Sequence, residues 1–179
     1  MQTRMQATSS FERFAGICAL AAGAAAFLYA VAFVLLRSAP LAALCLLAVG
    51  LLATAVQVGL YERLREVDPG WALWALALGL AGAVGAALHG GFDLATTIVP
   101  PPAATGEVPS QVDPRGLLTF GVTGLGLSVV AWLIGRDARL PRGLSRVGYA
   151  TAALSILLYL GRLIVFDAVS YTHLTLPTN

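Results

Sequence analysis

The sequence predicts an all-α fold, a polytopic transmembrane helix bundle of five spans. Of its 179 residues, 58% are hydrophobic and 11% are charged, whereas a soluble domain carries about 25% charged residues. The mean hydropathy is +0.82, and the apolar residues gather in long runs separated by short polar segments. Helices are the expected form, because lipid offers the backbone no hydrogen-bond partners and the runs lack the alternation of barrel strands.

The composition also excludes several classes of protein. The hydrophobicity is too high for a disordered chain, and two cysteines are too few for a disulfide scaffold. A nucleic-acid binder needs a basic surface that this chain lacks, so we expect no nucleic-acid partner. A soluble globular domain is disfavoured, because too few polar residues remain to cover it.

The first predicted span covers residues 14–36, with no charge between Arg13 and Arg37. Small residues at Ala24–Ala26 resemble a signal-peptide cleavage site. The apolar run continues well beyond them, however, and is too long for a typical signal peptide. We therefore expect an uncleaved first helix.

Four further spans follow, at residues 41–60, 71–98, 116–135 and 147–166. Pro40 suits the start of the second helix, where its missing N–H costs nothing. Cys18 and Cys45 would differ in depth by roughly 15–20 Å in an antiparallel helix pair. Because a disulfide needs Cα atoms within about 7 Å, we expect free thiols.

The arginines predict the orientation of these spans, since cytoplasmic loops are enriched in basic residues. With the N-terminus inside, ten of the arginines divide into eight on inner segments and two, Arg37 and Arg115, on outer ones. The inner residues are Arg4, Arg13, Arg63, Arg65, Arg136, Arg139, Arg142 and Arg146. We therefore expect the inner membrane of a bacterium, with a cytoplasmic N-terminus.

Small residues predict how the helices pack, because helices in lipid associate through close backbone approach. The third span has them at spacing four, with a second row beside the first, so we expect this helix to be central. The rows are Ala75, Gly79, Ala83, Ala87 and Gly91, and Gly82, Ala86 and Gly90. Shorter rows occur in the first span (Ala15, Ala19 and Gly23) and in the fourth (Gly121, Gly124 and Ser128).

Four polar residues in or beside the membrane form the candidate site, because intramembrane charges are costly. His89 and Asp93 are four residues apart and share a helix face, while Arg162 and Asp167 lie in and at the end of the fifth span. An Arg162–Asp93 pair or an Arg162–His89 contact would form if the two helices were neighbours. Three interpretations remain open: snorkelling or a structural ion pair, the lining of a polar pocket, and a proton relay or substrate contact.

We predict no catalytic residue, no cofactor and no metal site. A metal ion needs three or more ligands, and His89 and Asp93 would reach that number only if Glu107 and Asp113 folded back over them. Gln57 is expected to hydrogen-bond a neighbouring helix. Hydroxyl groups in the fourth span, on Thr119, Thr123 and Ser128, are expected to bond their own helix carbonyls.

The last eleven residues, 169–179, break the apolar pattern. VSYTHLTLPTN resembles the translation of a transposase-type sequencing adapter read in frame. We therefore expect residues 1–168 to form a single transmembrane domain followed by a non-native tail, and we leave Tyr171 and His173 out of any site. On this interpretation the natural gene continues past residue 168, and the five spans are truncated from six.

Three short motifs resemble a bacterial multi-pass membrane protein family of unknown function with about six helices. They are Arg13-Phe14-Ala15-Gly16, Leu60-Tyr61-Glu62-Arg63-Leu64, and the Pro141-Arg142-x-Leu144-x-x-x-Gly148 element that opens the last span. The resemblance covers roughly residues 11–167. It implies a topology and transfers no functional residues, because the family has no assigned activity.

The sequence leaves three functions open. The first is a non-enzymatic integral membrane protein with a structural, sensing or partner-binding role, whose partners are the lipid bilayer and either a second copy or another membrane protein. The second is a small transporter or channel component that uses His89, Asp93 and Arg162. The third is a membrane-embedded enzyme, for which no convergent set of polar groups can be named.

Overall fold

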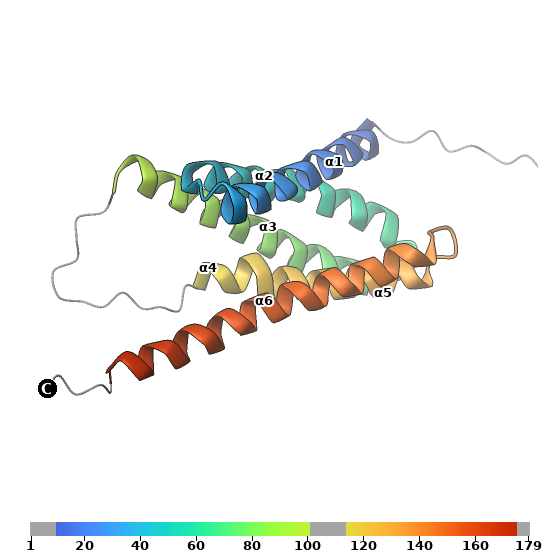
Figure 1. The fold of residues 1–179 in the computed structure, drawn as a ribbon. Coiled ribbons are helices and arrows are strands. Elements are labelled where there is room, and N and C mark those ends of the chain that lie inside the picture. The colour runs from blue at the N-terminus through green and yellow to red at the C-terminus, as the bar shows by residue number, and fades with distance from the viewer. Residues whose placement is uncertain (1–9, 101–113, 175–179) are drawn as a thin grey trace, which may run out of the picture.

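The fold is a bundle of long helices (Figure 1). The computed structural model describes residues 10–100 and 114–174, with side chains described up to residue 161. The elements in chain order are α1 (Ser10–Ala30), η1 (Val31–Leu35), α2 (Ala39–Leu64), α3 (Pro69–Ile98), α4 (Pro114–Gly116), η2 (Leu117–Val122), α5 (Thr123–Arg136) and α6 (Arg142–Leu174). All regular structure in these ranges is helical, and η1 and η2 are π-helical.

The predicted fold class is confirmed, because five helices are long and apolar enough to cross a membrane. The segment η1 continues α1, and α4, η2 and α5 form one continuous span. Pro40 lies in the first turn of α2, as expected. At the start of α3, the carboxylate of Asp68 accepts hydrogen bonds from the backbone N–H groups of Gly70 and Trp71, both at 3.1 Å, and thereby caps the helix.

The third span is central, as the sequence predicts. Helix α3 packs against α2, α5, η2 and α4, whereas α1 packs on α2, and α6 packs on α5 and η2 (Figure 1). In the most apolar stretch of α3, 39% of the residues are buried, against 11% in those of α1 and α6. The outer two helices therefore expose most of their surface.

Close backbone approach joins α2 to α3. A Cβ added at Gly90 would overlap the backbone of Leu47 and the carbonyl oxygen of Ala43, and one at Gly50 would overlap the backbone of Ala87. The second predicted row does not face a single partner, however, because Gly82 lies against Thr123 of α5. A spacing of four residues advances 40° per step on a 3.6-residue helix, so a row of this kind drifts around the axis.

The row predicted for the first span is wrong beyond Ala15. Ala19 and Gly23 are exposed, and a Cβ at Gly23 would meet no atom within 4 Å. The face that α1 and η1 turn inward alternates spacings of three and four, as in a coiled-coil seam. Its residues are Ala15, Cys18, Ala22, Ala25, Tyr29 and Ala32. Cys18 and Cys45 are buried free thiols, as predicted.

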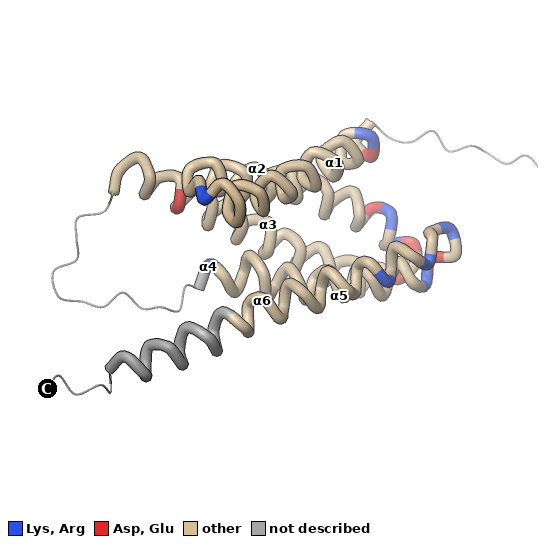
Figure 2. Tube along the Cα trace, viewed as in Figure 1, with Lys and Arg blue, Asp and Glu red and all other residues tan. Residues whose placement is uncertain are grey.

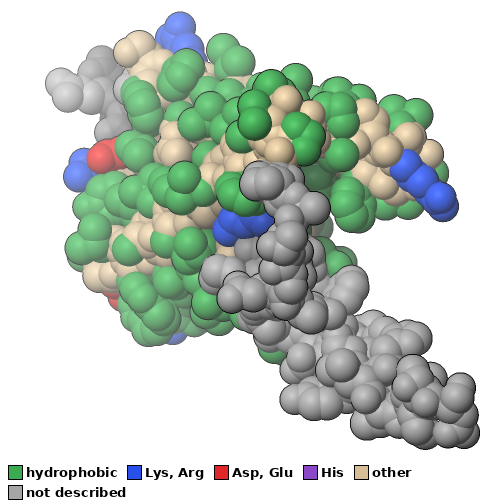
Figure 3. All heavy atoms as spheres, turned by 90° about the vertical axis from the view of Figure 1, so that its left-hand side faces the viewer, with side chains coloured by type: hydrophobic (Ala, Val, Ile, Leu, Met, Phe, Trp, Pro, Cys, Tyr) green, Lys and Arg blue, Asp and Glu red, His purple; other side chains and the backbone are tan. Residues whose placement is uncertain are grey.

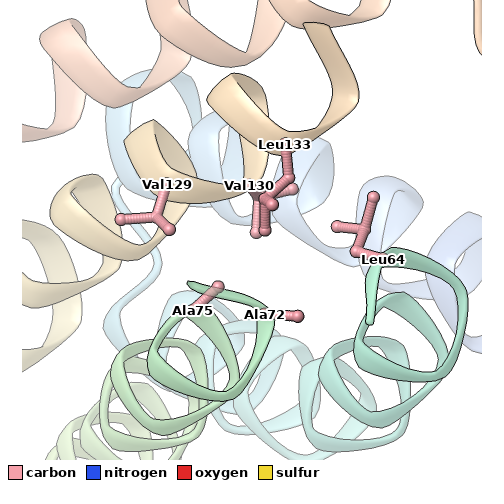
Figure 4. Close-up of a cluster of buried hydrophobic side chains, with 6 residues drawn as sticks. All are labelled: Leu64, Ala72, Ala75, Val129, Val130 and Leu133. Atoms are coloured by element: carbon pink, nitrogen blue, oxygen red, sulfur yellow. The ribbon is translucent and has the colours of Figure 1, made fainter. Parts of the chain in front are cut away.

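A cluster of buried side chains fills the space between the C-terminal end of α2, the start of α3 and α5. Leu64 and Leu133 are 1% and 0% exposed, respectively. Figure 4 shows them pointing into the space between the helices, together with Ala72, Ala75, Val129 and Val130. This cluster lies at the same end of the bundle as the turns that join α2 to α3 and α5 to α6.

Charged residues gather at the two ends of the bundle, with an apolar zone between them (Figure 2). We call the ends arginine-rich and arginine-poor. The arginine-rich end holds Arg13, Arg63, Arg65, Arg136, Arg139, Arg142 and Arg146. The arginine-poor end holds Arg37 and Arg115 among the residues whose side chains are described. Large hydrophobic side chains such as Leu20, Phe27 and Leu154 are exposed between the two ends. Figure 3 views the bundle from its arginine-poor end and shows hydrophobic side chains over much of that face as well.

Candidate polar site at the arginine-poor end

Four polar side chains from neighbouring helices meet at the arginine-poor end, and we call them the His89 cluster. His89 and Asp93 lie one turn apart on α3, Arg115 lies on α4, and Thr119 lies on η2. The segments α4 and η2 begin the membrane span that packs on α3. The cluster therefore joins the last turns of one membrane span to the first turns of the next.

His89 lies at the centre of the cluster. Its Nδ1 atom is 3.2 Å from the hydroxyl oxygen of Thr119, and its Nε2 atom is 3.5 Å from Oδ2 of Asp93. His89 and Thr119 are each 6% exposed. The carboxylate of Asp93 is more accessible, at 42%, and accepts a hydrogen bond of 3.1 Å from Nη1 of Arg115 on its other oxygen.

The hydroxyl group of Thr119 determines how the imidazole is oriented. It donates its one hydrogen to the backbone carbonyl oxygen of Arg115, at 2.8 Å. Because a hydroxyl has a single hydrogen, the oxygen of Thr119 accepts from Nδ1–H of His89. The Nε2 atom then faces the Asp93 carboxylate, and this contact is attractive when either group carries an additional proton.

Arg115 is held in place by two features of α3. Its guanidinium group bonds Asp93 and also lies over the ring of Phe92, 4.1 Å from the ring centroid. A cation at this distance is attracted by the aromatic face. The two contacts together position the arginine across the α3 surface.

The π-helical turn of η2 brings Thr119 into the cluster. η2 spans Leu117–Val122 and follows α4 without a break. A wider turn of this kind changes the direction in which the following side chains point, and such turns are often found at functional sites. A hydroxyl bonded to its own helix was predicted at Thr119, and that bond is confirmed; its contact with His89 was not predicted.

The structure brings together two of the four predicted site residues. His89 and Asp93 share a face, as expected, but the described partner of Asp93 is Arg115, which the sequence assigned to a loop. Arg162 and Asp167 lie outside the residues whose side chains are described. Among the described residues, their helix, α6, packs mainly on α5 and η2, and the Arg162 contacts with His89 and Asp93 stay predictions.

The remaining polar predictions have mixed outcomes. Ser128 donates to the carbonyl oxygen of Gly124, as expected for a hydroxyl on a membrane helix. The side-chain amide of Gln57 lies against Gly79 of α3. Glu107 and Asp113, the residues that a metal site would have needed, lie outside the described residues. Within those that are described, no three His, Cys, Asp or Glu residues are grouped to hold a metal ion.

A second polar cluster, which the sequence did not reveal, lies at the arginine-rich end. The carboxylate of Asp137 is 4% exposed and accepts from the backbone N–H, Nε and Nη2 of Arg139, at 2.9, 2.9 and 3.1 Å. Arg139 also bonds Glu66 at 2.6 Å. These side-chain hydrogen bonds from Arg139, with the backbone bond, lower the pKa of Asp137. The cluster joins the α5–α6 turn to the turn between α2 and α3.

Comparisons with known proteins identify no relative that could assign the site, because no protein-family model, curated protein or solved structure matches the chain.

Proposed function

We propose that the protein is a non-enzymatic integral membrane protein with a structural role in the bacterial inner membrane. The observation that supports this proposal is where the polar side chains lie and which helices they join. The ends of the bundle carry the charges, the zone between them exposes large apolar side chains, and the His89 cluster bonds α3 to the next span. The partners that we propose are lipid and either a second copy or another membrane protein.

The proposed orientation places the N-terminus in the cytoplasm. Seven described arginines lie at one end and two at the other, and basic residues favour the cytoplasmic side.

Reporter fusions test this orientation. Alkaline phosphatase or a fluorescent protein is fused after Val67, Val99 or Leu140. We expect fluorescence at Val67 and Leu140 and phosphatase activity at Val99. The opposite pattern would refute the orientation, and release of the protein from membranes by carbonate would refute integral insertion.

The structural role of the His89 cluster is tested by Asp93→Asn in the purified full chain. Asp93→Asn removes the charge that Arg115 and His89 contact, so we expect unfolding in detergent at a lower temperature. Glu62→Gln is the matched control, because Glu62 bonds Arg65 in an exposed pair at 3.0 Å at the opposite end, and such pairs contribute little stability. Equal effects of the two variants would argue against a structural cluster.

A second candidate function, a small transporter or channel component, is favoured by one observation. Asp93 and Arg115 are 42% and 30% exposed, while the His89 imidazole, which Asp93 contacts, is buried, so the cluster connects the surface to the interior. In proteoliposomes that enclose a pH-sensitive dye, transport of protons through the cluster would give a flux that Asp93→Asn abolishes. A purely structural role predicts no protein-dependent flux in the wild type.

A further inference from the structure

A groove of about 330 Å³ lies between α1 and α2 at the arginine-rich end. Its mouth carries the charged side chains of Glu12 and Arg13 from α1 and Arg63 from α2. Its walls are apolar and include Ala19 and Val56. The volume lies at the lower end of the range of about 300–1,000 Å³ for small-molecule sites.

Small residues create the groove. The two helices touch where Ala15 meets Gly59, since a Cβ at Gly59 would overlap the side chain of Ala15. Beside that contact, a Cβ at Gly16 would meet no atom within 4 Å. The groove is therefore an open space next to a close helix contact, and its floor is apolar.

The groove extends from the charged end of the bundle into the apolar zone. Arg13 and Ala19 are six residues apart on α1, which corresponds to about 9 Å along the helix. Trp71 and Trp74 contact each other at the same end of the bundle, with ring centroids 5.4 Å apart, and tryptophan marks the level of lipid headgroups. The arginines thus lie at headgroup depth and the apolar walls at acyl-chain depth.

We propose that this groove binds an anionic phospholipid. The phosphodiester group lies between Arg13 and Arg63, and one acyl chain follows the apolar walls toward Ala19 and Val56. Arginine is well suited to such a group, because its planar fork binds phosphate oxygens in pairs. Basic pockets between membrane helices on the cytoplasmic side are known lipid sites.

Glu12 limits which lipids fit the site. Its carboxylate lies among the groove residues and opposes a second negative charge, so the site favours a headgroup with one phosphate over one with several. A headgroup that carries hydroxyl groups, such as glycerol, can also donate a hydrogen bond to this carboxylate. Phosphatidylglycerol is therefore the probe of choice.

The experiment measures lipid binding to the full chain in a neutral detergent, by native mass spectrometry or by the lipid-dependent rise in unfolding temperature. We expect phosphatidylglycerol to bind at least tenfold more tightly than phosphatidylcholine. Arg13→Gln and Arg63→Gln should each weaken phosphatidylglycerol binding about fivefold, the effect of one basic residue near an anionic lipid surface. Glu12→Gln should strengthen it.

Arg142→Gln is the matched control. Arg142 is exposed at the same end of the bundle, at the start of α6, and does not line the groove. We expect its loss to leave binding unchanged. If Arg142→Gln weakens binding as much as Arg13→Gln, the attraction is general to this end and the groove proposal is overturned.

Gly16→Leu separates the groove from its charges. The new side chain enters open space, so the protein should still fold and retain its unfolding temperature without lipid, while phosphatidylglycerol binding falls. Unchanged lipid binding in this variant would overturn the acyl-chain part of the proposal. Glycerol phosphate tests the same point: tight binding of this soluble ester would make the ligand a free phosphate ester and not a lipid. Neither result depends on the orientation or structural role proposed above.

Discussion

The two ends of the bundle are held together by different means. At the arginine-rich end, large side chains fill the space between helices, with Leu64 and Leu133 almost fully buried, and an ion-pair cluster around Asp137 closes the turn. Toward the arginine-poor end, backbones approach at Gly50 and Gly90. His89 and Thr119 are buried there beside small or apolar residues such as Ala42 and Leu46, and both π-helical segments, η1 and η2, belong to this end.

Lipid is as apolar as leucine, so helices within it gain little from burying large side chains and associate through close packing and interhelical hydrogen bonds. Near the headgroups, water competes for polar groups and the hydrophobic effect contributes again. Both ends of the bundle lie near that level, so the difference between them follows from the residues at the helix contacts. Leucine and valine form the cluster at the arginine-rich end, beside a close contact of Ala15 with Gly59, whereas glycines such as Gly50 and Gly90 meet backbone toward the other end.

The largest expected effect tests the glycine contacts. Gly90→Ala should destabilise the protein by about 3 kcal/mol, because the added methyl group forces the backbones of α2 and α3 apart. Gly23→Ala is the control, since it places the same methyl group in open space on α1. Alanine favours a helix over glycine by about 1 kcal/mol, so the control should be neutral or stabilising. Unfolding in detergent measures both, and equal results would show that close approach does not hold this half.

Leucine truncation tests the opposite end. Leu133→Ala should cost about 2 kcal/mol, because it leaves a cavity among side chains that relax only partly. Leu125→Ala, on the same helix, removes the same atoms from a side chain that is 53% exposed, and its effect should be small. If Leu125→Ala costs as much as Leu133→Ala, the cluster around Leu64 does not act as a packed core.

The five spans could be predicted because length and hydropathy alone decide them. The packing of α1 could not be predicted from its small residues. Ala19 and Gly23 follow Ala15 at spacing four, but the helix turns inward along spacings of three and four. Small residues permit close contact on any face, and the neighbouring helix determines which face is used.

The candidate site was half predictable for a related reason. The pairing of His89 with Asp93 depends only on the helical period, so the sequence revealed it. The pairing of Asp93 with Arg115 depends on where the next helix begins. Pro114, which is favoured in a first turn, was the available signal that Arg115 lies at the start of a helix. The π-helical turn that brings in Thr119 has no comparable signal.

The Asp137 cluster was missed although its local pattern is simple. An aspartate that accepts the backbone N–H two residues later is a common turn, and Arg139 stands at that position. The burial of Asp137, however, depends on how the α5–α6 turn packs against the α2–α3 turn. That tertiary arrangement cannot be inferred from the sequence.

Acid should weaken the arginine-rich end. The pKa of Asp137 lies below its ordinary value of 3.8, chiefly because of the side-chain hydrogen bonds from Arg139. A carboxyl group whose pKa is lower when folded stabilises the protein above the unfolded pKa, and that contribution disappears as the pH falls through the folded pKa. The wild type should therefore lose this contribution to its stability below about pH 4, as measured by unfolding across a pH series. Asp137→Asn should be less stable at neutral pH and show a shallower acid loss, and parallel curves for the two proteins would contradict this account.

The smallest expected effect sharpens the comparison at the headgroup level of the arginine-rich end. The guanidinium group of Arg136 lies 3.7 Å from the ring centroid of Trp132, whose ring is 5.0 Å from that of Trp71. An exposed contact of this kind contributes about 0.5–1 kcal/mol, so Arg136→Gln should cost about that amount in the unfolding free energy. In a protein that already carries Trp132→Leu, adding Arg136→Gln should cost almost nothing further. This double-mutant cycle isolates the contact between the two side chains. A coupling near zero would mean that Arg136 acts only through the membrane surface, and the arginine-rich end would then be stabilised by its leucine cluster and the Asp137 cluster alone.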